Sequence, residues 1–73
     1  MRKAKKEELI ETERQLWNYL TRYMMRKNES PLRVEIAEAL DISPQLAQYR
    51  LRQLERKGWI ELIPLEKRNI MLK

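Results

Sequence analysis

The chain has 73 residues, which is the size of one small domain with a modest hydrophobic core. It contains neither cysteine nor histidine, which excludes disulfide bridges, thiolate metal sites and a histidine general base. No apolar run approaches the roughly 20 residues of a membrane-spanning helix, and the N-terminus lacks the apolar core of a signal peptide.

The formal net charge of +5 is unevenly distributed along the chain. Residues 1–6 carry four basic side chains, residues 7–42 carry five basic and eight acidic ones, and residues 43–73 carry seven basic and three acidic ones. This pattern indicates a polyanion as partner, either nucleic acid or an anionic membrane surface. The basic stretch at residues 2–6 is compatible with two roles, contact with phosphates or an unstructured, solubilising end.

Residues 5–27 are predicted to form one long helix, preceded by a flexible basic tail at 1–4. The segment lacks glycine and proline, and its apolar stripe recurs at helical spacing at Leu9, Ile10, Leu16, Trp17, Leu20, Tyr23 and Met24. A capping box formed by Thr12 and Gln15 is the alternative, and it would start the helix later. We expect the helix to stop at Asn28, because asparagine tolerates the left-handed conformation.

A second helix is predicted to follow a serine-proline pair. Ser30 would be its N-cap and Pro31 its first residue, where the missing N–H costs nothing. The helix would run to Leu40 and point three side chains inward, those of Ile36, Ala37 and Leu40.

A turn of three residues, 41–43, separates this helix from a third one. Ser43 and Pro44 repeat the capping pattern, and the third helix would end at Lys57 with Gly58 as the left-handed residue after it. Its inward seam is predicted at Ala47, Leu51 and Leu54. So tight a turn forces the two helices to cross steeply, with Ile42 in the core and Asp41 in a strained backbone position usually filled by glycine.

Two short apolar runs, residues 59–63 and 69–72, are separated by a charged segment at 64–68. That spacing is typical of a two-stranded hairpin, which must pack on the helices to be stable. The side chains expected to point to the core are Ile60, Leu62, Ile70 and Leu72. The predicted fold is therefore mostly α with a small β-hairpin.

The outer side of the third helix is predicted to carry hydrogen-bonding and basic side chains, at Gln45, Gln48, Tyr49, Arg52 and Arg56. Amide and guanidinium groups of this kind read base edges in the major groove of DNA, which is wide enough to admit a helix. The alternative is a solvated polar face without a partner. The tight turn, the basic third helix and the basic hairpin tip favour DNA.

The run "PLRVEIAEALDISPQLAQYRLRQLERKGWIEL", residues 31–62, resembles the winged helix-turn-helix DNA-binding domain of the LexA family of bacterial SOS repressors. The resemblance covers roughly residues 9–72. Its most specific parts lie at 33–37, at 43–44, at 51–61 and in the hairpin length to Ile70. It implies a single winged helix-turn-helix domain over 1–73, with three helices and a two-stranded wing.

The resemblance implies that base-reading residues lie early in the third helix. Carried over by matching position they are Ser43, Gln45, Leu46, Gln48 and Tyr49, to which the outer face adds Arg52. The glutamines would pair with adenine, the leucine would contact a thymine methyl group, and the tyrosine would stack or reach a phosphate. The residues expected to contact the DNA backbone are Arg33, Arg56, Lys67 and Arg68.

The sequence also departs from the family pattern. The turn is one residue shorter, with Asp41 in place of glycine, and Leu32 replaces the usual hydroxyl cap before the second helix. The base-reading positions differ chemically from those of the family, so we expect a different operator. The protease and dimerisation domain that follows in LexA is missing from this sequence, so a small stand-alone regulator of a bacterium, phage or plasmid is expected.

The predicted function is that of a sequence-specific regulator of transcription, in the first instance a repressor, that binds double-stranded DNA. Helix 44–57 would read the major groove and wing 64–69 the backbone or minor groove. A homodimer on DNA is expected, with Tyr19 and Met25 as candidate contacts, and the protein would act in the cytoplasm at the nucleoid.

Two other functional classes are alternatives to this one. A winged helix can serve as a protein-interaction module, such as an antirepressor or an assembly factor. An enzyme has little support, because the sequence offers neither a nucleophile–base pair nor a phosphate-cradling glycine loop. No cofactor, metal, membrane or small-molecule substrate is predicted.

Overall fold

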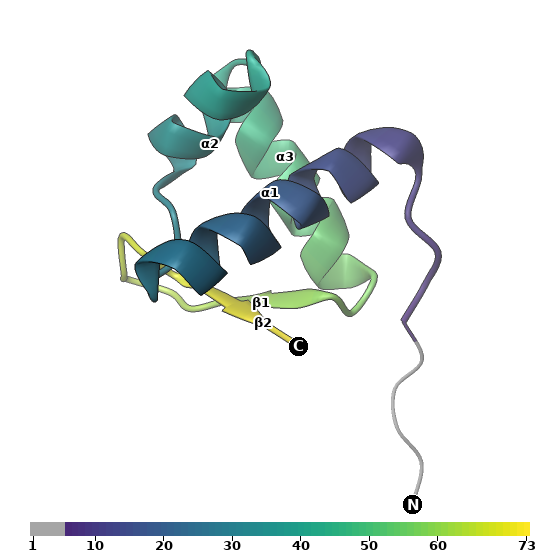
Figure 1. The fold of residues 1–73 in the computed structure, drawn as a ribbon. Coiled ribbons are helices and arrows are strands. Elements are labelled where there is room, and N and C mark those ends of the chain that lie inside the picture. The colour runs from purple at the N-terminus through teal and green to yellow at the C-terminus, as the bar shows by residue number, and fades with distance from the viewer. Residues whose placement is uncertain (1–5) are drawn as a thin grey trace, which may run out of the picture.

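The computed structural model describes residues 6–73, which form three helices followed by an antiparallel hairpin (Figure 1). The elements are α1 (Glu11–Lys27), α2 (Arg33–Leu40), α3 (Pro44–Arg56), β1 (Ile60–Leu62) and β2 (Ile70–Leu72). The predicted winged helix-turn-helix architecture is confirmed. The predicted tail at 1–4 lies outside the described residues.

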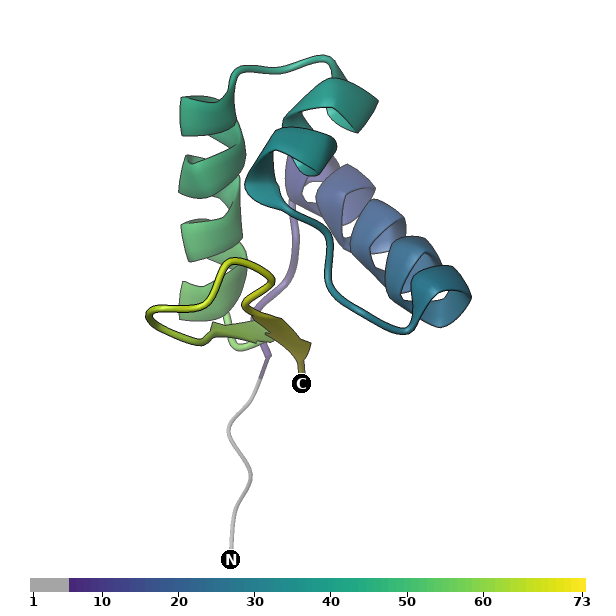
Figure 2. The same cartoon turned by 90° about the vertical axis from the view of Figure 1, so that its left-hand side faces the viewer.

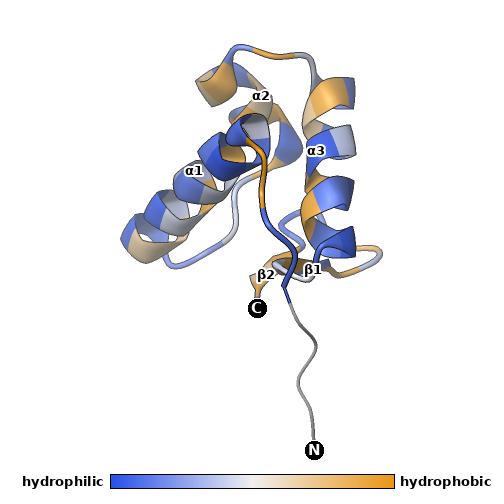
Figure 3. Cartoon of the chain, turned by 90° about the vertical axis from the view of Figure 1, so that its right-hand side faces the viewer, coloured by the Kyte–Doolittle hydropathy of each residue, from blue (hydrophilic) through white to orange (hydrophobic). Residues whose placement is uncertain are grey.

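The core lies where all three helices meet the hairpin. It is built from one side of each element, at Leu16, Leu20, Ile36, Ala37, Ala47, Leu51, Leu54, Ile60 and Ile70. Hydrophobic and hydrophilic residues therefore alternate along each helix, as burial of one side requires (Figure 3). The predicted inward residues of α3 are all confirmed, and in α2 Ile36 and Ala37 are buried while Leu40 is half-buried.

The prediction that the first helix begins at residue 5 is wrong, because backbone groups of Glu7 and Glu8 form hydrogen bonds with Lys57 and Trp59 instead of helical ones. The Glu7 N–H donates to the Lys57 carbonyl at 3.0 Å, and the Trp59 indole N–H donates to the Glu7 carbonyl at 2.7 Å. The Lys57 ammonium donates to the Glu8 carbonyl at 3.2 Å. These partners replace the hydrogen bonds of a further helical turn.

Glu13 sets the actual start of α1. Its carboxylate accepts from the Ile10 N–H at 3.1 Å, so the cap is formed by the third helical residue rather than by Thr12 and Gln15. Ile10, predicted to face the core, is 59% exposed at this boundary. Burial raises the pKa of Glu13, but the Lys57 ammonium 2.5 Å away and the Ile10 N–H outweigh that effect and hold the pKa below its ordinary value.

The predicted start of the second helix is also wrong by two residues. The Ser30 hydroxyl does not cap the helix, because it accepts from the Ile70 N–H of β2 at 3.3 Å. The Glu35 carboxylate instead accepts from the Leu32 N–H at 2.7 Å, and the helix begins at the next residue. Pro31 is fully buried before the helix rather than inside it.

The corner between α2 and α3, residues 41–43, has the predicted geometry. Asp41 adopts the left-handed conformation at φ 58° and ψ 48°, and the Ile42 N–H donates to the Ala37 carbonyl at 2.9 Å. The Ser43 hydroxyl then accepts from the Leu46 N–H at 3.1 Å, and Pro44 is the first residue of α3. Ile42 packs against the core, as predicted. The predicted left-handed residues after α1 and α3 are also confirmed, with Asn28 at φ 58° and Gly58 at φ 88°, although α3 ends at Arg56, one residue before the predicted Lys57.

The hairpin pairs Ile60 with Leu72 and Leu62 with Ile70. The predicted inward orientation is confirmed for Ile60 and Ile70, while Leu62 is half-buried. It is wrong for Leu72, which is 36% exposed in the last pair of the ladder.

We expect Asp41→Gly to raise the free energy of unfolding by roughly 0.5 kcal/mol. Glycine adopts the positive φ of this position without steric cost, and this gain exceeds the larger loss of backbone freedom that glycine undergoes on folding. Asp41→Val should lower it by about 1–2 kcal/mol, since a branched side chain is strained there. Urea unfolding followed by circular dichroism measures both. The control Glu38→Gly, on an exposed position inside α2, should destabilise by about 1 kcal/mol. Equal effects at the two positions would contradict the assigned strain.

The lowered pKa of Glu13 predicts a pH dependence of stability. The unfolded chain binds more protons than the folded one as the pH falls below the ordinary value of 4.5, so the stability that this carboxylate contributes is present above pH 4.5 and is lost on acidification. Chemical unfolding between pH 3 and 7 should therefore give a shallower acid slope for Glu13→Gln than for the wild type. The control is Glu11→Gln, which replaces an exposed carboxylate without a side-chain partner within residues 6–73, and it should change the slope less than Glu13→Gln does.

Candidate nucleic-acid interface

The outer side of α3 is open to solvent. Most of the predicted base-reading residues are exposed, namely Ser43, Gln45, Tyr49 and Arg52, while Leu46 and Gln48 are half-buried. Figure 2 shows α3 standing along one side of the molecule, with the C-terminal end of α1 on the opposite side. Nothing in residues 6–73 covers this side of the helix.

A side-chain hydrogen bond connects α3 to the start of α2. Nη1 of Arg33, the first residue of α2, donates to the Gln48 Oε1 at 3.2 Å. Both residues line one solvent-filled hollow together with Pro44 and Gln45. Two predicted classes of contact residue, one for bases and one for the DNA backbone, thus meet directly.

The wing completes the concave surface. A second hollow is lined by residues of α2, α3 and the wing, among them Arg33, Gln48 and Lys67. We call this concave surface the α3–wing face and define it by Arg33, Gln45, Gln48, Arg52 and Lys67. The tight corner and the hairpin together bring these five side chains, widely spaced in sequence, to one side of the molecule.

Asn69 belongs to the same region and was missed by sequence reasoning. It is half-buried and lines a hollow with Gln48 and Arg52, between α3 and the wing. Its amide is of the same chemical type as the glutamines of α3. No motif pointed to it, because its position depends on how the hairpin folds back on α3.

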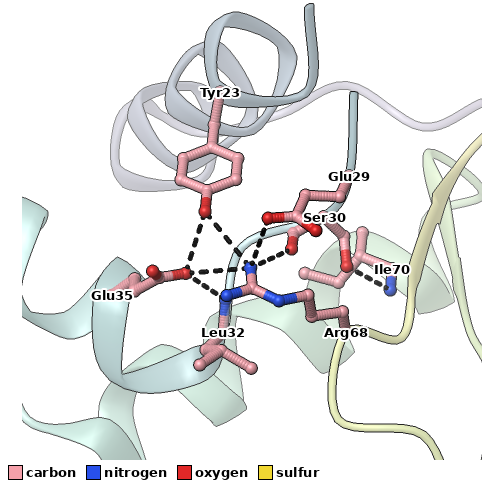
Figure 4. Close-up of polar contacts among 7 residues, drawn as sticks. All are labelled: Tyr23, Glu29, Ser30, Leu32, Glu35, Arg68 and Ile70. Atoms are coloured by element: carbon pink, nitrogen blue, oxygen red, sulfur yellow. Dashed lines mark hydrogen bonds and ion pairs between the residues drawn. The ribbon is translucent and has the colours of Figure 1, made fainter. Parts of the chain in front are cut away.

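Arg68 is bound within the protein (Figure 4). Its Nη1 donates to the Ser30 carbonyl at 2.9 Å, to the Tyr23 hydroxyl at 3.2 Å and to the Glu35 Oε1 at 3.3 Å. Glu29 Oε2 is a further ion-pair partner at 3.4 Å. The guanidinium that the sequence assigned to the DNA backbone therefore links the wing to α1, to α2 and to the loop between them, whereas Lys67 is exposed and makes no hydrogen bond within residues 6–73.

Glu35 is the centre of this Arg68 cluster, which consists of Tyr23, Glu29, Ser30, Glu35 and Arg68. The Leu32 N–H is the main cause that holds the pKa of Glu35 below its ordinary value; partial burial opposes it, and the Tyr23 hydroxyl and the Arg68 charge add to it. A glutamate three residues after the cap position is a known capping signal. The signal is hard to recognise in this sequence, because Leu32 occupies the cap position where serine or threonine is usual.

The positive charge available on the α3–wing face is smaller than the sequence suggests. Lys57 is neutralised by Glu13, and Arg68 by Glu29 and Glu35. Arg56 is exposed and donates to the Gln53 side chain of the same helix. The exposed cations among the predicted contact residues that form no ion pair within residues 6–73 are therefore Arg33, Arg52, Arg56 and Lys67.

Neither a membrane-spanning helix nor a metal-binding group of side chains is found in the part of the chain that the structure describes. Each helix there is too short or too polar to cross a lipid bilayer. No group of three or more acidic, histidine or cysteine side chains within residues 6–73 is arranged to hold a metal ion.

Comparison with known proteins agrees with the geometry. A family model described as the LexA DNA binding domain matches residues 6–69, which include all three helices, the corner and the tip of the wing. The search of curated proteins found no match. Because the family model matches most of the sequence, the chain belongs to the family of LexA DNA-binding domains.

Proposed function

We propose that this domain binds double-stranded DNA at specific sequences and regulates transcription, in the first instance as a repressor. The observation that carries the proposal is the α3–wing face: an exposed helix with amide and guanidinium groups stands beside Arg33 and Lys67, in a chain of the LexA DNA-binding family. A B-form major groove admits an α-helix, and the residues near the helix N-terminus reach the bases first.

The base-reading residues have distinct chemistry. The amide of Gln45 makes no hydrogen bond within residues 6–73, so it is free to pair with the two edge groups of adenine. The Ser43 hydroxyl accepts the cap hydrogen bond and keeps its own hydrogen to donate to a base or phosphate. Leu46 would contact a thymine methyl group, Tyr49 would stack or reach a phosphate, and Arg52 would bind guanine.

Phosphate contacts would fix the orientation of the domain. Lys67 at the wing tip, Arg56 at the end of α3 and Arg33 at the start of α2 flank the reading helix and leave exposed cationic groups for the DNA backbone. Arg68 would act on DNA through the position of the wing, because its guanidinium is already paired within the protein.

A second copy would complete the binding unit. One helix and one wing form a small interface, and useful affinity then requires two half-sites about one helical turn apart. Met25 of α1 is 87% exposed and remains the candidate contact, whereas Tyr19 packs partly against the core. In a bacterial or phage-infected cell such a protein would act at the nucleoid.

Selection of bound duplexes from a random DNA pool with the 73-residue chain tests the proposal. The expected result is one enriched motif, arranged as two related half-sites when two copies bind. No enrichment, together with no chemical-shift changes on adding DNA at low salt, would contradict DNA binding. That outcome would favour a protein-interaction module of the same fold.

Substitutions on the α3–wing face should separate base reading from backbone contact. Gln48→Ala should lose about 1–3 kcal/mol of discrimination at one or two base pairs and leave the remaining positions unchanged. Lys67→Ala should weaken binding to every sequence alike and reduce the slope of log K against log salt by about 0.9. Equilibrium binding to the selected site, to single-base variants and at several salt concentrations measures both effects.

The matched control is Lys27→Ala, which removes one exposed charge at the end of α1 farthest from α3 (Figure 2). It should leave discrimination unchanged and lower the salt slope less than Lys67→Ala does. Equal losses on all DNA from Gln48→Ala and Lys67→Ala would refute the assigned roles.

Arg68→Met should weaken DNA binding for a different reason from a lost phosphate contact. The variant keeps an alkyl side chain but breaks the hydrogen bonds to Ser30, Tyr23 and Glu35, so the wing loses its attachment to the helices. We expect a lower thermal midpoint, faster hydrogen exchange at the Ile70 amide and weaker binding to all sequences. Lys67→Met, the adjacent substitution of a cation by the same residue, should weaken binding without the first two changes.

A further inference from the structure

The Gln48 side chain already accepts a hydrogen bond from Arg33 in the free protein. This hydrogen bond limits how the amide can bind a base. Arg33 Nη1 lies 3.2 Å from the Gln48 Oε1. A guanidinium has five N–H donors and no acceptor, so only the carbonyl oxygen of the amide can face it. The amide group is therefore held in one of its two orientations, with the oxygen toward Arg33 of α2 and the NH₂ group free to donate elsewhere.

This orientation changes the base preference that a free glutamine would have. A free amide pairs with adenine through both ends, since its NH₂ donates to N7 and its oxygen accepts from the N6 amino group. The oxygen keeps a second lone pair, but the cation bound to it weakens it as an acceptor, and the guanidinium charge beside it disfavours the N6 amino donor of adenine. Guanine presents two acceptors, N7 and O6, which suit the NH₂ donor and the neighbouring guanidinium.

Gln45 provides an internal comparison one helical turn earlier. It lies in the same hollow as Gln48 and Arg33, but its amide has no hydrogen-bond partner within residues 6–73. It can turn either way and keeps the adenine preference of a free glutamine. Gln45 and Gln48 are thus chemically identical but differ in the hydrogen bonds that remain available to them.

Arg33 also retains donors for the DNA itself. One N–H contacts Gln48, and the exposed remainder of the guanidinium can bind a phosphate oxygen. A phosphate contact would hold Arg33 in place and so strengthen the constraint on the glutamine while the bases are being read.

We infer that Arg33 is a specificity-determining residue that orients the Gln48 amide as a donor, so that Gln48 selects guanine over adenine at its base pair. The inference rests on the proposed function and deepens it. It replaces the expectation from sequence that both glutamines read adenine.

The experiment uses the 73-residue chain and its selected DNA site. The base pair read by Gln48 is first located as the one at which Gln48→Ala loses discrimination. Equilibrium binding is then measured with each of the four base pairs at that position, for the wild type, Arg33→Met and Arg56→Met. Circular dichroism verifies that every variant is folded, which is expected because both arginines are exposed.

The wild type should prefer guanine to adenine at this pair by about tenfold, a value within the range for one well-formed base contact. Arg33→Met frees the amide, so this ratio should fall roughly tenfold, and adenine becomes as good as guanine or better. Arg56→Met removes the same charge and should weaken all sequences alike without changing the ratio. Gln48→Glu introduces a carboxylate, which can only accept hydrogen bonds. This variant should lose the preference for guanine and favour cytosine instead.

The inference is overturned if the wild type prefers adenine at this pair, or if Arg33→Met leaves the ratio of guanine to adenine unchanged. It also fails if Gln48→Ala changes discrimination at no position, since Gln48 then reads no base. In each of these cases a selected DNA site exists and the proposed function stands. Failure of the wild type to select any site removes the proposed function and the inference with it.

Discussion

The arrangement of this domain depends on the backbone of Asp41. Its left-handed conformation lets the Ile42 N–H return to the Ala37 carbonyl, so α2 ends at Leu40 and only three residues separate it from α3. A connection this short leaves little freedom in the crossing of the two helices. The start of α2 consequently lies beside the middle of α3, where Arg33 reaches Gln48. One strained residue thus fixes both the exposure of α3 and the contact between Arg33 and Gln48.

The wing is a second structure that cannot stand by itself. Two strands of three residues are marginal in water, so the hairpin depends on contacts with the helices. Those contacts are polar as well as apolar: the Ile70 N–H donates to Ser30, the Leu62 N–H donates to Glu55, and Arg68 joins the loop before α2. The loop that precedes α2 therefore contacts the wing and leads directly into α2. It connects the helical part of the α3–wing face with the wing.

Much of this could be predicted from sequence, because helical stripes, proline caps and left-handed stop residues are local signals. The apolar seam at Ala47, Leu51 and Leu54 and the stop at Asn28 follow from spacing and backbone preference alone. The starts of α1 and α2 could not be predicted in this way. At both starts the cap is a glutamate three residues inside the helix, and the segment before it is bound by residues more than 35 positions away. Such distant competition leaves no trace in local periodicity.

The same limit applies to charge. A count along the sequence treats every lysine and arginine as available to a polyanion. Within the domain, however, Lys57 and Arg68 form ion pairs with Glu13 and Glu35. A small domain with few apolar residues needs such pairs to hold its edges, and charges paired in this way do not displace counterions from DNA. Among the predicted contact residues, the exposed cations without an ion pair within residues 6–73 are Arg33, Arg52, Arg56 and Lys67, so the net charge of +5 is a poor guide to the cations that the α3–wing face and its flanks offer. One of these four, Arg33, is also hydrogen-bonded to Gln48, so a substitution at this position would remove a charge and a side-chain contact together.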